Sequence, residues 1–294
     1  MRYAAHEILV REARSRPGLW RLVLGVLLVM AVQMGLIYAV FGLVAALRGT
    51  AIAQAIFQSI FVTTLTGSDA VFLLLSFAAL IIGTLVAANL LHGRGLPSLT
   101  GPPAWAAAHF TRTLGALTLL YAVLWVALPT GIEIVPNLAF GHWLSLLPLA
   151  LPALLIQTGA EELLFRGYMQ QQLAARFRSP FVWVGVPSAL FALGHYAPDQ
   201  TGPNAVAASL WAGAFALAAA DLTARTGTLG AAIALHFANN AASVLFVSLP
   251  GPVSGLSLYT YPFAADDPAV QPLMLVDLGV IGVSWLAARL ALRV

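Results

Sequence analysis

Long apolar runs fill most of this chain, and few folds can bury them. They lie at about residues 19–46, 70–91, 104–128, 144–175, 180–197, 204–224, 227–249 and 271–292. Hydrophobic residues make up 60% of the 294 residues and charged residues only 9%. A water-soluble surface does not tolerate this composition, whereas a helix of about 20 apolar residues crosses the hydrocarbon core of a bilayer. The sequence therefore predicts an all-α, polytopic integral membrane protein with about eight transmembrane helices in one bundle.

The full length, residues 1–294, is expected to form a single membrane domain, because eight spans and short loops leave no room for a soluble one. The segment 50–69 mixes polar and apolar residues and is not assigned to a span. Cysteine is absent, which excludes disulfides, thiolate ligands and a cysteine nucleophile. No basic run with interleaved aromatic residues points to nucleic acid, so the lipid bilayer is the expected partner.

The placement of arginine predicts the orientation of the chain. All fourteen basic residues are arginine. With the N-terminus inside, twelve of them fall at cytoplasmic ends of the expected helices, and only Arg48 falls outside. Arg166 is left out of this count because it belongs to an intramembrane cluster. The sequence thus predicts an even number of crossings, with both the N- and the C-terminus in the cytoplasm.

Charged residues interrupt the apolar run 144–175, where Glu161 and Glu162 are followed by Arg166. Ionisable groups inside membrane segments are rare and usually face a cavity or a partner. Glu162 and Arg166 are four residues apart, with the acid first, which favours an ion pair on a helix. Glu161 points about 100° away from its neighbour and is free to face a polar cavity. The alternative is a buried salt-bridge network that only fixes helix packing.

Two histidines and an asparagine lie in the following runs. Glu161 and His195 are each 17 residues from Arg178, at the turn between two antiparallel helices, and are expected to be level. His236 follows the turn after Arg225 by nine residues, which places it about 14 Å deep, shallower than the ~20 Å of the other two, although tilt or staggered turns could close this gap. The three glutamines 170–172 indicate that their helix runs on into a wet cavity or the cytosol.

His236 and Asn240 are four residues apart and project from one helix face, whereas Asn239 is expected to point elsewhere. Histidine and asparagine in membrane helices often only join helices by hydrogen bonds. Taken together, however, these groups outline hydrolytic machinery. A carboxylate beside an imidazole can take a proton from water, and a second histidine with an asparagine can stabilise an oxyanion.

Three motifs carry a resemblance to a known family. They are Glu161-Glu162-x-x-x-Arg166-Gly167, Phe191-x-x-x-His195 and His236-x-x-x-Asn240, on three separate helices. The chain resembles the CPBP family of intramembrane proteases, which includes the CAAX-processing endopeptidases. It does so in the order of these motifs and in the sequences around them, EELLFRGYMQQQL, SALFALGHY and TGTLGAAIALHFANN. The resemblance covers roughly residues 145 to 249, which would be the catalytic core.

The resemblance implies an intramembrane endopeptidase that hydrolyses a peptide bond. Glu161 and His195 would activate water, and His236 and Asn240 would stabilise the oxyanion. Glu162, Arg166 and Phe191 would support the shape of the site. The substrate would be a hydrophobic or membrane-associated peptide or protein, prenylated CAAX-type substrates included, because eukaryotic relatives remove a tripeptide from prenylated proteins.

Two alternatives stay open. A catalytic zinc could be held by Glu161, His195 and His236, although a metal-free mechanism explains Asn240 better and is preferred. The chain could also be a non-catalytic membrane scaffold, an immunity protein or a transporter that keeps the polar cluster for structure. Asp221 departs from the family pattern, because small or apolar residues are expected in its helix; it is expected to cap the helix end near Arg225.

Overall fold

Six helices of the computed structural model, which describes residues 3–63, 66–127, 131–251 and 253–294, are long and apolar enough to cross a membrane. They span Leu19–Arg48, Gly67–His92, Pro103–Ala127, Phe140–Arg176, Pro198–Thr226 and Val270–Leu292. The prediction of an all-α, multi-pass membrane protein is confirmed, but the number of eight spans is not. The runs expected at 180–197 and 227–249 form the shorter apolar helices Pro180–Gly194 and Gly230–Phe246.

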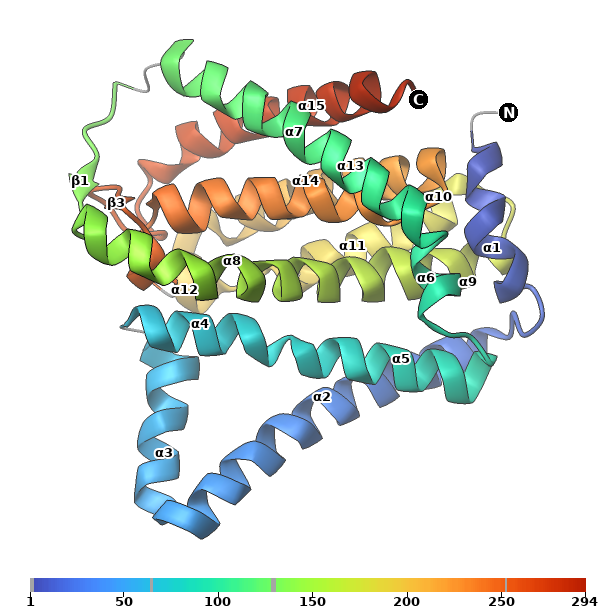
Figure 1. The fold of residues 1–294 in the computed structure, drawn as a ribbon, viewed down its shortest axis with the longest axis horizontal. Coiled ribbons are helices and arrows are strands. Elements are labelled where there is room, and N and C mark those ends of the chain that lie inside the picture. Colours follow the sequence, from blue (N-terminus) through green and yellow to red (C-terminus); the bar gives the residue numbers. More distant parts are fainter. Residues whose placement is uncertain (1–2, 64–65, 128–130, 252) are drawn as a thin grey trace.

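The helices are arranged as a bundle (Figure 1). The first half of the chain contains Glu7–Ala13 (α1), Leu19–Arg48 (α2), Thr50–Gln58 (α3), Gly67–Ser76 (α4), Ala78–His92 (α5), Leu96–Thr100 (α6), Pro103–Ala127 (α7) and Phe140–Glu162 (α8). The second half contains Gln170–Arg176 (α9), Pro180–Trp183 (α10), Gly185–Gly194 (α11), Pro198–Thr201 (α12), Ala205–Thr226 (α13), Gly230–Ala241 (α14) and Val270–Leu292 (α15). Wider π-helical turns occupy Ser59–Thr63, Leu163–Met169 and Ala242–Phe246. The unassigned segment 50–69 thus contains α3 and the start of α4.

A three-stranded sheet lies at the end of the bundle away from the two chain termini (Figure 1). Its strands are Val135–Pro136 (β1), Val247–Ser248 (β2) and Tyr259–Thr260 (β3). The order is β1-β3-β2, with β1 antiparallel and β2 parallel to β3. The sequence did not predict this sheet, because strands of two residues show no alternating pattern.

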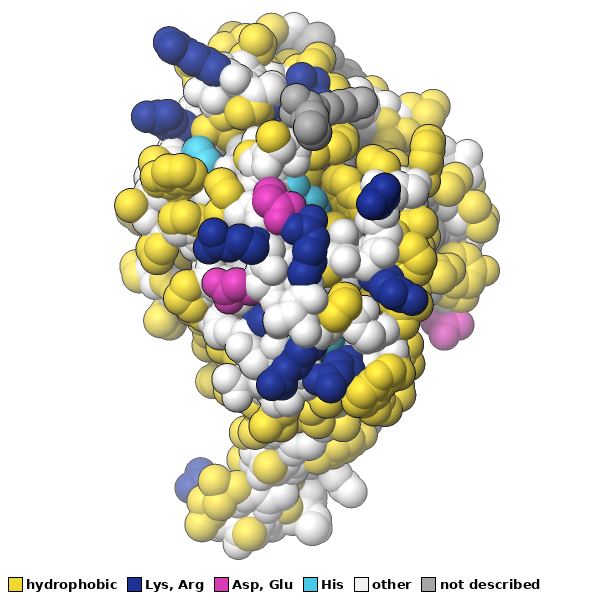
Figure 2. Space-filling view, turned by 90° about the vertical axis from the view of Figure 1, so that its right-hand side faces the viewer, with side chains coloured by type: hydrophobic (Ala, Val, Ile, Leu, Met, Phe, Trp, Pro, Cys, Tyr) yellow, Lys and Arg dark blue, Asp and Glu magenta, His cyan; other side chains and the backbone are white. Residues whose placement is uncertain are grey.

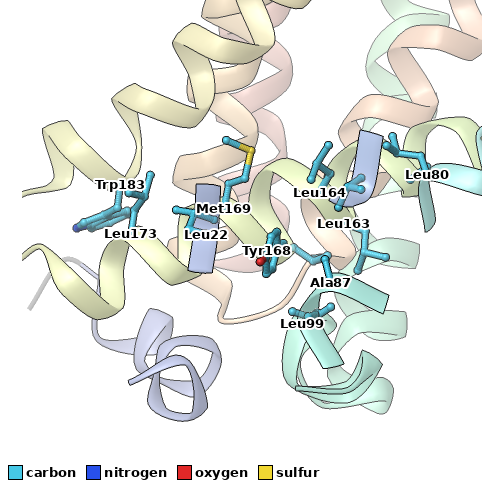
Figure 3. Packing of buried hydrophobic residues seen from close by; sticks show 14 of the residues in the cluster. Leu22, Leu80, Ala87, Leu99, Leu163, Leu164, Tyr168, Met169, Leu173 and Trp183 are labelled. Atoms are coloured by element: carbon cyan, nitrogen blue, oxygen red, sulfur yellow. The ribbon is translucent and has the colours of Figure 1, made fainter. Parts of the chain in front are cut away.

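Close packing in the bundle depends on small residues. In α13, Ala212, Ala216, Ala219 and Ala220 have no exposed surface. Small side chains allow neighbouring helices to approach closely in membrane proteins. Elsewhere, a Cβ atom at Gly25 in α2 would lie 1.9 Å from the Tyr168 hydroxyl oxygen, so only glycine fits there. Figure 3 shows Tyr168 within the buried cluster that includes Leu22 and Leu99.

The three glutamines of α9 are buried, so the expectation of a wet cavity or cytosol around them is wrong. Gln170, Gln171 and Gln172 are at most 2% exposed. Gln170 donates a hydrogen bond to the Ala220 carbonyl (3.1 Å), and Gln171 donates one to the Leu99 carbonyl (2.8 Å). Gln170 and Gln171 therefore join helices, a common use of amides in membrane proteins, whereas the Gln172 amide has no hydrogen-bond partner among the described residues.

Asp221 holds three parts of the chain together at the end of the bundle where both termini lie (Figure 1). It forms an ion pair with Arg225, four residues further along α13, at 2.7 Å, whereas the sequence suggested a helix cap. It also accepts hydrogen bonds from the Tyr3 hydroxyl (2.8 Å) and from the indole of Trp285 in α15 (2.9 Å). Figure 2 shows arginine side chains spread over this end. The cytoplasmic location of the termini stays a prediction.

The buried His6 makes docking of the N-terminal segment pH-dependent. Its side chain packs against Trp183 and is 4% exposed. Burial lowers the pKa of His6 from 6.5 to about 4, with smaller opposing effects of Glu7, which raises it, and Arg14, which lowers it. Unfolded His6 gains a proton near pH 6.5, whereas folded His6 gains one only near pH 4. Stability is therefore lost as the pH falls between these values.

We predict that lowering the pH from 7.5 to 5 reduces the free energy of unfolding of the wild type by about 2 kcal/mol more than that of His6→Gln. Thermal unfolding in detergent at the two pH values measures the difference. Equal losses in both proteins would contradict this assignment of the pH dependence to His6.

Candidate active site

A buried ion pair begins the site at the C-terminal end of α8. Glu162 is the last residue of that helix, and the π-helical turn Leu163–Met169 follows it. Such turns occur frequently at functional sites. Arg166 lies in this turn and donates a hydrogen bond to Glu162 Oε1 at 2.9 Å, and its other terminal nitrogen donates one to the Ala216 carbonyl at 3.0 Å. Both charged side chains are at most 1% exposed. The ion pair expected from the sequence is present.

His236 of α14 connects the two glutamates. Its Nδ1 donates a hydrogen bond to Glu162 Oε1 at 2.8 Å, so this oxygen accepts from both His236 and Arg166. Its Nε2 faces Glu161 Oε2 at 3.6 Å, which is slightly too long for a hydrogen bond. Within the described residues, Glu161 Oε2 is buried and has no hydrogen-bond partner. Oε2 of Glu162 likewise has no partner among these residues, but its Oε1 is held by two donors, whereas Glu161 meets His236 only at 3.6 Å.

Glu161 and His236 line a small cavity of about 50 Å³. Its walls come from α8, α11, α13 and α14 and from the residue that follows α11. The polar lining residues are Gln157, Glu161, His195, His236, Asn239 and Asn240, and the aromatic ones are Phe191, Trp211 and Phe215. The structure therefore brings the four residues expected to be catalytic around one cavity. It also gives the bundle the polar cavity that the sequence predicted.

His195 lies directly after the C-terminal end of α11. Its ring stacks on Phe191, with 4.4 Å between ring centroids, and its Nδ1 donates a hydrogen bond to the Phe191 carbonyl at 2.8 Å. That bond places the ring proton on Nδ1 and leaves the Nε2 lone pair free to accept a proton. Phe191 is buried, and the guanidinium of Arg166 lies 4.9 Å from its ring centre. Phe191 thus contacts both the histidine and the buried arginine.

Asn240 belongs to a chain of amides. It donates a hydrogen bond to Gln157 Oε1 at 3.0 Å, and its own oxygen accepts one from Asn239 at 3.3 Å. The expectation that Asn239 points elsewhere is wrong, because it lines the same cavity. Gln157 was missed in the sequence, although it precedes Glu161 by one helical turn and so shares its face. Trp211 and Phe215 were also missed, and no motif marks them.

His236 lies beside Glu161, so the shallower position expected for it is wrong. That depth was counted from Arg225 on the assumption that the next turn lies at the membrane surface. The turn is buried instead: Thr226 is 5% exposed, Thr228 and Leu229 are fully buried, and the Leu229 amide donates to the Thr100 carbonyl at 3.0 Å. Because α14 begins inside the protein, nine residues carry His236 deeper than counting from the surface suggests.

Glu161, His195 and His236 are not grouped as ligands of one zinc ion in the described residues. Among the described residues, no group of three His, Asp or Glu side chains is placed to hold one metal ion. Since a structural or catalytic zinc takes at least three protein ligands, the alternative gains no support from the geometry. It stays a prediction from the sequence.

Fold and site together define a multi-pass, all-α membrane protein with a polar cavity inside its helices. Residues 142–242 match the family described as type II CAAX prenyl endopeptidase Rce1-like. This segment contains the three motifs, and the match confirms the resemblance to the CPBP family there.

A curated relative shares part of this sequence. The uncharacterized protein YyaK of Bacillus subtilis (strain 168) is 31% identical over 114 residues, which are 39% of this chain and 38% of the relative. The chain thus matches well under half the length of that relative. No solved structure is significantly similar to the chain.

Removing the buried cation should reduce the stability of the protein far more than removing an exposed one. We predict that Arg166→Met lowers the free energy of unfolding by about 3–5 kcal/mol, because Glu162 would lose its main buried partner. The matched control is Arg14→Met, which breaks the half-exposed pair with Glu7 and should cost at most about 1 kcal/mol. Unfolding in detergent measures both. Similar losses for the two variants would show that the buried pair is not an important source of stability.

Proposed function

We propose that this protein is an intramembrane endopeptidase that hydrolyses a peptide bond in a hydrophobic, membrane-associated substrate. The observation that carries the proposal is that two adjacent carboxylates have different surroundings. Glu162 is held at Oε1 by Arg166 and His236 and does not line the cavity, whereas Glu161 lines it and meets His236 only at 3.6 Å. A structural ion-pair network needs only the first carboxylate. The match of residues 142–242 to a prenyl endopeptidase family supports the same class of reaction.

In the proposed reaction, Glu161 accepts a proton from water while the water oxygen bonds to the carbonyl carbon of the substrate. His195 assists, because its free Nε2 lines the same cavity and can accept a hydrogen bond from the water. The electron pair of the carbonyl π bond moves to oxygen and forms an oxyanion. When the carbon–nitrogen bond breaks, the proton passes from Glu161 to the leaving amine. The products are a carboxylic acid and an amine, which leave as a carboxylate and an ammonium after the acid proton moves to the amine.

Asn240 and His236 are the proposed oxyanion donors. Asn240 has a second amide hydrogen besides the one it donates to Gln157. His236 uses its Nδ1 proton on Glu162, so its Nε2 can donate only when the ring carries two protons. Because Glu161 then carries the proton taken from water, the charge of the ring would be balanced by the oxyanion and by Glu162. His236 thus couples the oxyanion to the buried Glu162–Arg166 pair.

The substrate class follows from the walls of the cavity. Three aromatic side chains line it beside the polar groups, which suits an apolar residue next to the cleaved bond. Peptides anchored in the membrane, prenylated CAAX-type peptides included, meet this requirement. The mechanism as proposed uses no metal. The scaffold, immunity-protein and transporter alternatives require no role for Glu161 in bond cleavage.

We predict that Glu161→Gln abolishes cleavage while the protein stays folded, because glutamine cannot accept the proton from water. The assay uses purified protein, a prenylated peptide and a library of membrane-tethered peptides, with and without a strong chelator. Glu133→Gln, in an exposed loop, is the matched control and should keep wild-type activity. Equal cleavage by wild type and Glu161→Gln would contradict the proposal. Loss of activity with chelator and its recovery with zinc would establish the zinc alternative instead.

Asn240→Ala should lower kcat by about a hundredfold to a thousandfold with little change in KM, the usual effect of losing one oxyanion donor. Steady-state kinetics on the best substrate from the library measures this split. A higher KM at unchanged kcat would mean that Asn240 only binds substrate.

A further inference from the structure

Gln157 is a cavity residue that forms a hydrogen bond to Asn240, one of the proposed oxyanion donors, from another helix. It lies in α8, one turn before Glu161, and is 7% exposed. Its Oε1 accepts a hydrogen bond from Asn240 Nδ2 at 3.0 Å, across the contact between α8 and α14. Neither the three motifs nor the expected ion pair requires a polar residue at this position.

The hydrogen bonds around Asn240 fix the direction of its amide. A free asparagine side chain can exchange the places of its oxygen and nitrogen by rotation. Here the oxygen accepts from Asn239 at 3.3 Å, and one amide hydrogen is donated to Gln157. Rotation would place nitrogen against nitrogen on one side and oxygen against oxygen on the other. The amide of Asn240 is therefore held in one orientation relative to Gln157 and Asn239, beside the cavity that all three amides line.

Gln157 also links the two halves of the proposed chemistry. Because Gln157 and Glu161 lie one turn apart in the same helix, the geometry of α8 fixes the distance between the base and the contact to Asn240. A donor that is already oriented stabilises the transition state without reorganisation during the reaction. A leucine of similar size would fill the space but would leave the amide of Asn240 free to rotate.

We infer that Gln157 is a positioning residue for Asn240 and holds its free amide hydrogen toward the oxyanion. The inference rests on the proposed function. Gln157 itself donates nothing to the substrate; it acts through Asn240. Removal of Gln157 therefore slows the chemical step and has no effect once Asn240 is absent.

A double-mutant cycle tests this inference with the full-length protein and the best-cleaved membrane-tethered peptide. Gln157→Leu should lower kcat about tenfold and leave KM and the unfolding midpoint nearly unchanged. In the Asn240→Ala background, the same substitution should change kcat less than twofold. Gln157→Glu, which keeps an acceptor for Asn240, should recover part of the lost rate. The matched control is Gln172→Leu, a buried glutamine in α9 remote from the cavity lining, which should leave kcat unchanged.

Two results would overturn the inference alone while Glu161→Gln stays inactive. One is wild-type kcat in Gln157→Leu, and the other is an equal fold loss in the wild-type and Asn240→Ala backgrounds. Wild-type activity in Glu161→Gln would instead overturn the proposed function, and the inference with it.

Discussion

One carboxylate oxygen, Oε1 of Glu162, holds the centre of this molecule together. It accepts hydrogen bonds from Arg166, in the π-helical turn after α8, and from His236, in α14. A fully buried carboxylate is costly unless it is paired and hydrogen-bonded, so the two donors and the acid depend on one another. Arg166 in turn reaches a carbonyl of α13 and the ring of Phe191. Through this one oxygen, four helices are placed around a single cavity.

The alanine-rich α13 makes that arrangement possible. Arg166 and Gln170, four residues apart, bond to the carbonyls of Ala216 and Ala220, which are also four residues apart. The two helical segments therefore run side by side in the same direction for one full turn, at a distance that larger side chains would prevent. Phe215, on the same helix, packs against His236 with 4.7 Å between ring centroids. The alanines thus position the site without taking part in its chemistry.

The sequence predicted most of the site because helical periodicity is a local property. The pairing of Glu162 with Arg166, and the different direction of Glu161, follow from rotation about one helix axis.

The depth of a residue in the membrane does not follow from helical rotation, since it depends on where the preceding turn lies. The buried turn before α14 put His236 deeper than expected, and the interhelical contacts of α9 buried three glutamines that the sequence placed in water. Helical periodicity could have predicted that Gln157 lies on the same face as Glu161. The positions of Trp211 and Phe215 depend instead on packing between distant segments. Two of the eight expected spans proved shorter: one helix ends at Gly194, directly before the cavity residue His195, and the other begins only at Gly230, after the buried turn.

The central claim is that a free carboxylate in the cavity activates water and does not itself attack the substrate. A single turnover in water enriched with heavy oxygen, followed by mass spectrometry, tests it most directly on a peptide that the protein cleaves. The proposed mechanism predicts one heavy oxygen atom in the new carboxylate of the product and none in the enzyme. Heavy oxygen in the Glu161 side chain, with an unlabelled product, would show that the carboxylate formed a covalent intermediate and would contradict the claim.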